Sequence, residues 1–93
     1  MDRSFYIEYN GKILGDASVA KLVYDNVKGC NCMNYKEPIN WLLEHCTQLN
    51  TINVANAIQH LYYYLVGISN STLWNNIDNY CEELAEEGKI VEW

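Results

Sequence analysis

The chain has 93 residues, a formal net charge of −6 and a charged fraction of 19%, and this length suits one domain, residues 1–93, with a single core. No apolar run approaches the roughly 20 residues that a membrane span needs. The first five residues, Met1-Asp2-Arg3-Ser4-Phe5, lack the charged start and apolar stretch of a signal peptide. We therefore expect a cytoplasmic protein whose four cysteines are thiols.

The negative charge lies mostly in the second half of the chain. From Glu37 through Gly88 the sequence contains no lysine or arginine, and residues 37–93 carry eight acids against the single cation Lys89. A surface that binds nucleic acid neutralises phosphates with cations. The pattern thus argues against nucleic acid or an anionic membrane as the direct partner, and it favours a protein with a basic surface.

A β-hairpin and a helix are predicted at the start of the chain. Apolar and polar residues alternate over 5–9, and Asn10-Gly11 is the dipeptide that best tolerates a tight hairpin turn before a returning strand at 12–14. Asp16 or Ser18 can cap a helix that ends at Gly29, because the apolar residues of this segment form one helical stripe. Residues 29–37 show no period and are predicted to be a loop.

Three further helices and a strand are predicted downstream. Pro38 begins a helix over about 38–48, Asn50 or Thr51 caps one that ends at Gly67, and Asn70 or Ser71 starts one that ends at Gly88. Residues 89–93 are apolar enough to be a closing strand, which needs a partner and has the N-terminal hairpin available. The predicted fold is therefore α+β, with the order β-β-α-α-α-α-β and a small sheet packed on four helices.

Four soft side chains in one short window raise the question of a zinc site. Cys30, Cys32, His45 and Cys46 could ligate tetrahedral zinc if the loop and the second helix converge. However, the Cys-x-Cys spacing is tighter than in ordinary zinc sites, and adjacent ligands on a helix point about 100° apart. We predict no metal and no cofactor, and the sequence leaves the role of these four residues open.

A catalytic signature is missing from the sequence. His45 and His60 are the candidate general bases, and neither has a nucleophile motif around a serine or cysteine. The position of His60 beside the apolar face of its helix favours a partly buried structural histidine. With no glycine-rich phosphate loop and no basic clamp, the prediction is a protein that is not an enzyme.

The candidate binding residues lie on the last helix and in a run of three tyrosines. Because Tyr62-Tyr63-Tyr64 spans more than half a helical turn, at least one of these rings must leave the core. Exposed tyrosine and tryptophan are typical interface anchors. The predicted partner-binding set combines outward-facing acids and amides with aromatic anchors, namely Asp78, Glu82, Glu83, Glu86, Glu87, Asn75, Asn79, Trp74, Tyr63 and Tyr64.

The end of the chain resembles part of a winged helix-turn-helix domain. Gly67-Ile68-Ser69-Asn70 is similar to the turn before a recognition helix, and Glu87-Gly88-Lys89-Ile90-Val91 is similar to the strand that follows one. The resemblance implies that amides, including Asn70, Asn75 and Asn79, would meet DNA, where asparagine can read adenine. Five acids on the same helix oppose DNA binding, so we interpret the likeness as one of packing.

In size, acidity and lack of a catalytic motif, the chain is similar to small phage-encoded inhibitors of bacterial defence, such as anti-CRISPR and other DNA-mimic proteins. This resemblance implies an acidic helix that occupies the basic nucleic-acid channel of a host effector. One alternative is a small helical regulator or winged-helix-like adaptor that acts through protein contacts or self-association as a possible homodimer. Another is a small-molecule or signal-nucleotide binder, which would need Arg3, Lys12, Lys21 or Lys28 to converge on a pocket.

Overall fold

The computed structural model describes residues 3–93, which form an α+β fold with a two-stranded antiparallel hairpin and four α-helices. After a short 3₁₀ turn at Arg3–Phe5, strand β1 (Ile7–Tyr9) pairs with β2 (Lys12–Leu14) in a register that places Ile7 opposite Leu14. Both turn residues are left-handed, with φ of +50° at Asn10 and +79° at Gly11, as a tight hairpin turn requires. The hairpin prediction is confirmed.

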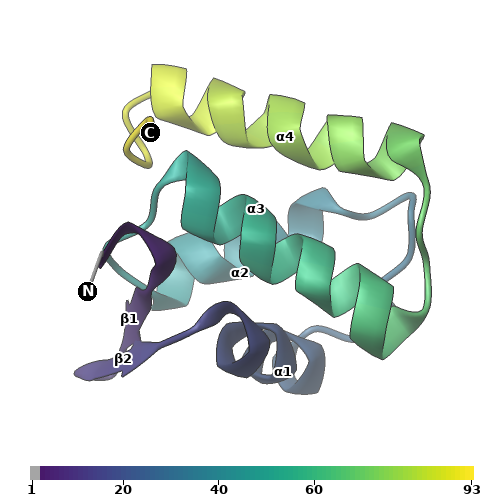
Figure 1. Ribbon diagram of the computed structural model, residues 1–93, viewed down its shortest axis with the longest axis horizontal. Helices are drawn as coiled ribbons and strands as arrows, with labels where there is room; N and C mark the ends of the chain where they lie inside the picture. Colours follow the sequence, from purple (N-terminus) through teal and green to yellow (C-terminus); the bar gives the residue numbers. More distant parts are fainter. Residues whose placement is uncertain (1–2) are drawn as a thin grey trace.

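The four helices pack in layers around a central one. Helix α3 (Thr51–His60) lies between α4 (Ser71–Glu86) and α1 (Asp16–Asn26), and α2 (Lys36–His45) lies behind α3 in the view of Figure 1. Each helix turns an apolar stripe inward. The largest fully buried members of the shared core are Tyr62, Ile7, Ile39, Leu42, Ile58, Leu61, Leu73, Ile77 and Leu84. Helix α4 is thereby anchored along its whole inner side.

Two buried asparagines fix the start of α3. The Asn50 side chain accepts hydrogen bonds from the backbone N–H groups of Ile52 (2.9 Å) and Asn53 (2.8 Å), and the Asn53 side chain accepts one from the Asn50 N–H (2.9 Å). The amide nitrogen of Asn50 also donates to the carbonyl of Ser4 at 2.8 Å. The predicted cap is therefore confirmed, and it ties the helix to the N-terminal segment.

The helix that contains the three tyrosines changes its winding where they occur. Leu61–Val66 form a π-helical segment, η2, in which the Gly67 N–H donates to the Tyr62 carbonyl at 2.8 Å. Tyr62 is fully buried and its hydroxyl donates to the carbonyl of Asn31, whereas Tyr63 and Tyr64 are 54% and 68% exposed. The prediction that at least one ring leaves the core is confirmed.

The C-terminal segment differs from the prediction. Among residues 3–93 no strand follows α4, and Val91 forms an isolated parallel bridge with Asn50 in place of pairing with the hairpin. One edge of the hairpin, at Glu8 of β1, is paired with Thr47, and α2 ends at His45, before this contact, and not near residue 48. The tail instead exchanges backbone hydrogen bonds with Leu49 and Thr51.

Candidate binding surface

The predicted acids form one surface on the outer side of α4. Its inner side is buried through Leu73, Ile77, Cys81 and Leu84, so the opposite side faces solvent. We call this surface the acidic face, and it contains only exposed residues, namely Asn75, Asp78, Asn79, Glu82, Glu83, Glu86 and Glu87. Asp78, Glu82 and Glu86 recur every fourth residue, about 6 Å apart along the helix axis. The structure therefore brings seven of the predicted binding residues together on a rigid support.

The acids of α4 lie toward the end of the helix at which the helix dipole favours cations. The first turn of α4 contains no acid and its last turn contains no base, although anions are stabilising at a helix N-terminus and cations at a C-terminus. Glu82, Glu83 and Glu86 lie in the second half of the helix instead. Partial burial raises the pKa of Asp78 above its usual value, because desolvation penalises the charged form.

The carboxylates of the acidic face have little internal compensation. Lys89 pairs at 3.4 Å with Glu87, the residue that directly follows α4. The side chains of Asp78, Glu82, Glu83 and Glu86 make no ion pair with residues 3–93. Their charge is therefore available to a cationic partner.

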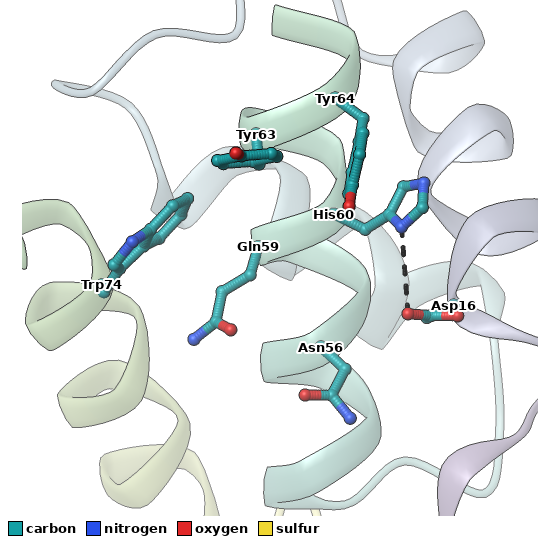
Figure 2. A pocket seen from close by; sticks show the side chains of 7 residues that line it. All are labelled: Asp16, Asn56, Gln59, His60, Tyr63, Tyr64 and Trp74. Carbon is teal, nitrogen blue, oxygen red and sulfur yellow. Dashed lines mark ion pairs between the residues drawn. The ribbon is translucent and has the colours of Figure 1, made fainter. Parts of the chain in front are cut away.

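A shallow groove crosses the outward surface of α3 between α1 and α4. It encloses about 380 Å³, and we call it the aromatic groove. Figure 2 shows Trp74 of α4 on one side, the side chains of α3 and η2 in the middle, and Asp16 of α1 on the other side. Its lining residues are Asp16, Asn56, Gln59, His60, Tyr63, Tyr64 and Trp74. The three predicted aromatic anchors thus share one depression.

Close ring contacts organise the groove. The His60 ring lies 4.5 Å from the ring of Tyr64, which in turn meets Tyr63 edge to face at 4.8 Å. Nδ1 of His60 lies 3.9 Å from the Asp16 carboxylate, as the dashed line in Figure 2 marks. These contacts hold aromatic faces and one carboxylate around an open space, an arrangement suited to stacking and to binding a cation.

Sequence reasoning did not identify four of the groove residues. Asp16 was considered only as a helix cap, His60 was considered as a general base and interpreted as a structural histidine, and Asn56 and Gln59 were not singled out. A signal was present, because residues 56, 59, 60 and 63 follow the three-and-four spacing of one helical face opposite the buried stripe. The contribution of Asp16 depends on tertiary packing and has no local signal.

The four candidate zinc ligands do not converge. The imidazole of His45 stacks on Trp41 at 4.3 Å and its Nδ1 lies 2.9 Å from the Trp41 carbonyl oxygen, while Cys46 is buried in the core. Cys30 donates its S–H to the carbonyl of Val27. Within residues 3–93, no three histidine, cysteine or acidic side chains are grouped as metal ligands would be.

The buried thiols are poorly suited to nucleophilic chemistry. Burial raises the pKa of Cys46 to about 11 and, with the added effect of nearby Asp78 and Glu82, that of Cys81 to about 12. Both side chains therefore stay protonated near neutral pH, and the thiolate, which is the nucleophilic form, is hardly populated. They act as small apolar members of the core.

None of the helices in the described residues 3–93 is both long and apolar enough to cross a bilayer. Of the basic residues considered for a nucleotide pocket, Lys21 pairs with Asp25 on α1, and Lys28 lies beyond the end of that helix. No family model matches the chain, and no curated protein and no solved structure is significantly similar to it.

Proposed function

We propose that this chain is a non-enzymatic binding protein that docks the acidic face of α4 on a basic surface of another protein. The observation that carries the proposal is the placement of the acids on α4. They are exposed, almost unpaired and concentrated toward the helix C-terminus, where a helix by itself favours cations. A sequence under selection for stability alone gains from the opposite arrangement.

The cost of this arrangement supports an external role. Like charges at i and i+4 destabilise a helix by about 0.2 to 0.5 kcal/mol per pair, and the acidic face contains the pairs Asp78–Glu82, Glu82–Glu86 and Glu83–Glu87. Departures from local rules of this kind are expected at functional sites. A cationic partner would attract the same carboxylates and offset their mutual repulsion, so the charge pattern favours binding of a cation.

The chemistry of the acidic face suggests which basic surface it fits. Carboxylates on a rigid helix present a row of negative charge as a nucleic-acid backbone does, and basic surfaces that bind nucleic acid are complementary to such a row. We therefore propose the nucleic-acid-binding surface of a protein as the docking site. That this partner is a bacterial defence effector, and that the chain is phage-encoded, stays a prediction from the resemblance of size and acidity.

A second candidate function is a small regulator that associates with another protein or with itself through tyrosines. The exposure of Tyr63 and Tyr64 favours it. Salt distinguishes the two functions. Association led by charge weakens steeply as ionic strength rises, whereas association led by tyrosine contacts does not.

The test compares two variants with equal net charge. The α4 variant carries Glu82→Gln, Glu83→Gln and Glu86→Gln, and the control variant carries Glu8→Gln, Asp25→Asn and Glu37→Gln on β1, α1 and α2. Each changes the formal charge from −6 to −3. Tagged wild-type protein and both variants are incubated with bacterial lysate at low salt and eluted in a salt gradient, and the eluted proteins are identified.

The proposal predicts that the control variant retains the salt-labile partner and the α4 variant loses it. Equal retention by both variants would refute a role for the acidic face. If the wild-type protein retains no salt-labile partner and self-associates, the second candidate function replaces the first.

A further inference from the structure

We infer that the aromatic groove binds an arginine side chain of the protein on which the acidic face docks. This inference rests on the proposed function for the source of the arginine, and it deepens that function by naming a specific contact. The groove and the acidic face share helix α4, because Trp74 lines the groove and Asp78 follows one turn later on the same helix. A basic surface lying along α4 therefore passes the mouth of the groove.

The aromatic rings fit a guanidinium group. Tyr63 and Tyr64 expose more than half of their surface, and Trp74 reaches the groove from the opposite wall (Figure 2). Ring faces attract cations through their quadrupole, and the planar, weakly hydrated guanidinium also stacks on them. The rings thus provide the apolar part of an arginine site.

The polar residues of the groove complement the charge and the donors of arginine. Among the described residues, Asp16 is the only acid in the lining and no lysine or arginine lines the groove, so its fixed charge favours a cationic occupant over an anionic one. Within residues 3–93, the side-chain amides of Asn56 and Gln59 have no hydrogen-bond partner. Their carbonyl oxygens, together with the Asp16 carboxylate, can accept several of the five N–H groups of a guanidinium.

The same geometry favours arginine over lysine. The acceptors Asp16, Asn56 and Gln59 come from different positions around the groove (Figure 2), which matches donors that spread in a fixed fork. Tyr63 and Tyr64 meet edge to face at 72° and do not form a closed box around a compact ammonium. An ammonium is also more strongly hydrated and loses more on entering the groove.

The direct test uses the purified chain and a short peptide, acetyl-Gly-Arg-Gly-amide. Two analogues serve as controls, one with lysine and one with citrulline, which has nearly the shape of arginine but no charge. Two-dimensional ¹⁵N–¹H NMR follows the backbone amides, the side-chain amides of Asn56 and Gln59, and the indole N–H of Trp74. The inference predicts saturable shifts at these groups with the arginine peptide, weaker shifts with lysine, and none with citrulline. Equal shifts with citrulline, or no shifts in the groove with arginine, would overturn it.

A pair of tyrosine variants tests the role of the rings. Tyr63→Leu removes a ring of the groove, and Tyr24→Leu removes an exposed tyrosine of α1 outside the groove. Loss of one exposed cation–π contact should weaken binding of the arginine peptide about two- to fivefold in Tyr63→Leu. Binding should be unchanged in Tyr24→Leu. Equal affinities of Tyr63→Leu and the wild-type protein would contradict the inference.

The peptide titration and the lysate experiment fail independently. If the arginine peptide binds in the groove but the α4 variant retains every partner, the proposed docking function is wrong and the groove site stands. If the α4 variant loses its partner but the peptide does not bind, the docking function stands and the arginine site is wrong.

Discussion

Removing charge from the acidic face should stabilise the protein. In the α4 variant, glutamine replaces Glu82, Glu83 and Glu86, and it has nearly the same helix propensity and size as glutamate. The exchange leaves the Lys89–Glu87 ion pair in place, so that the change in stability reports on repulsion within α4. We therefore expect the free energy of unfolding to rise in a variant designed to lose function.

The magnitude follows from two electrostatic effects. Three like-charge pairs at i and i+4 disappear, namely Asp78–Glu82, Glu82–Glu86 and Glu83–Glu87, each worth about 0.2 to 0.5 kcal/mol. Glu83 and Glu86 lie in the last turn of α4, where each anion costs about 0.3 to 1 kcal/mol against the helix dipole. Neighbouring charges are not additive, so we expect a total of about 1 to 3 kcal/mol at low ionic strength.

Chemical and thermal unfolding can measure this gain. For a domain of this size, about 1 to 3 kcal/mol corresponds to a rise in Tm of about 5 to 20 °C. The difference between the α4 variant and the wild-type protein should be largest near 10 mM salt and shrink in about 1 M salt, where the Debye length is about 3 Å. A variant that is less stable than the wild-type protein at low salt would show that the carboxylates stabilise the fold, contrary to the expected repulsion.

Three further predictions concern the core. Asn50→Ala removes a buried cap together with the hydrogen bond to the Ser4 carbonyl, and it should lower the free energy of unfolding in urea by about 2 to 4 kcal/mol. Asn70→Ala, at the exposed cap of α4, should lower it by about 1 kcal/mol. Equal losses in the two variants would contradict the role of burial. Tyr62→Phe should lower stability by about 1 kcal/mol through loss of the hydrogen bond to the loop carbonyl, and an unchanged urea midpoint would count against that bond. The raised pKa of Cys81 implies stability that is complete below pH about 9, the value for an ordinary thiol, and is lost as the pH rises toward about 12. Cys81→Ala should flatten the pH dependence of unfolding between pH 9 and 11, and an unaltered slope would show that other groups cause it.

The sequence predicted those parts of the fold that local chemistry determines. Asn10-Gly11 gave the hairpin, Asn50 and Asn70 gave the starts of α3 and α4, and Gly67 ended the helix of the three tyrosines. The position of residues 89–93 could not be predicted in this way. It depends on tertiary contacts, because Thr47 pairs with Glu8 at one edge of the hairpin and Val91 pairs with Asn50, and no local pattern indicates either contact.

In the candidate site, too, one part follows from the local sequence pattern and another part depends on tertiary packing. The acidic face follows from helical spacing, because the buried stripe of α4 determines which side is exposed. The aromatic groove does not, since it combines α1, α3, η2 and α4, and the π-helical winding of η2 contributes to the placement of Tyr63 and Tyr64. Sequence reasoning therefore identified the aromatic anchors individually and missed the Asp16 and His60 pair that completes their surroundings.

The central claim is that the acidic face occupies a surface with which the partner binds nucleic acid. The most direct measurement is a competition experiment. A partner that the wild-type protein retains is first bound to its own nucleic-acid ligand, which carries a fluorescent label. Increasing amounts of the chain are then added at constant salt. We expect the wild-type protein and the control variant to displace the nucleic acid completely, whereas the α4 variant should need a much higher concentration. Formation of a ternary complex, or equal displacement by the α4 variant, would contradict the central claim.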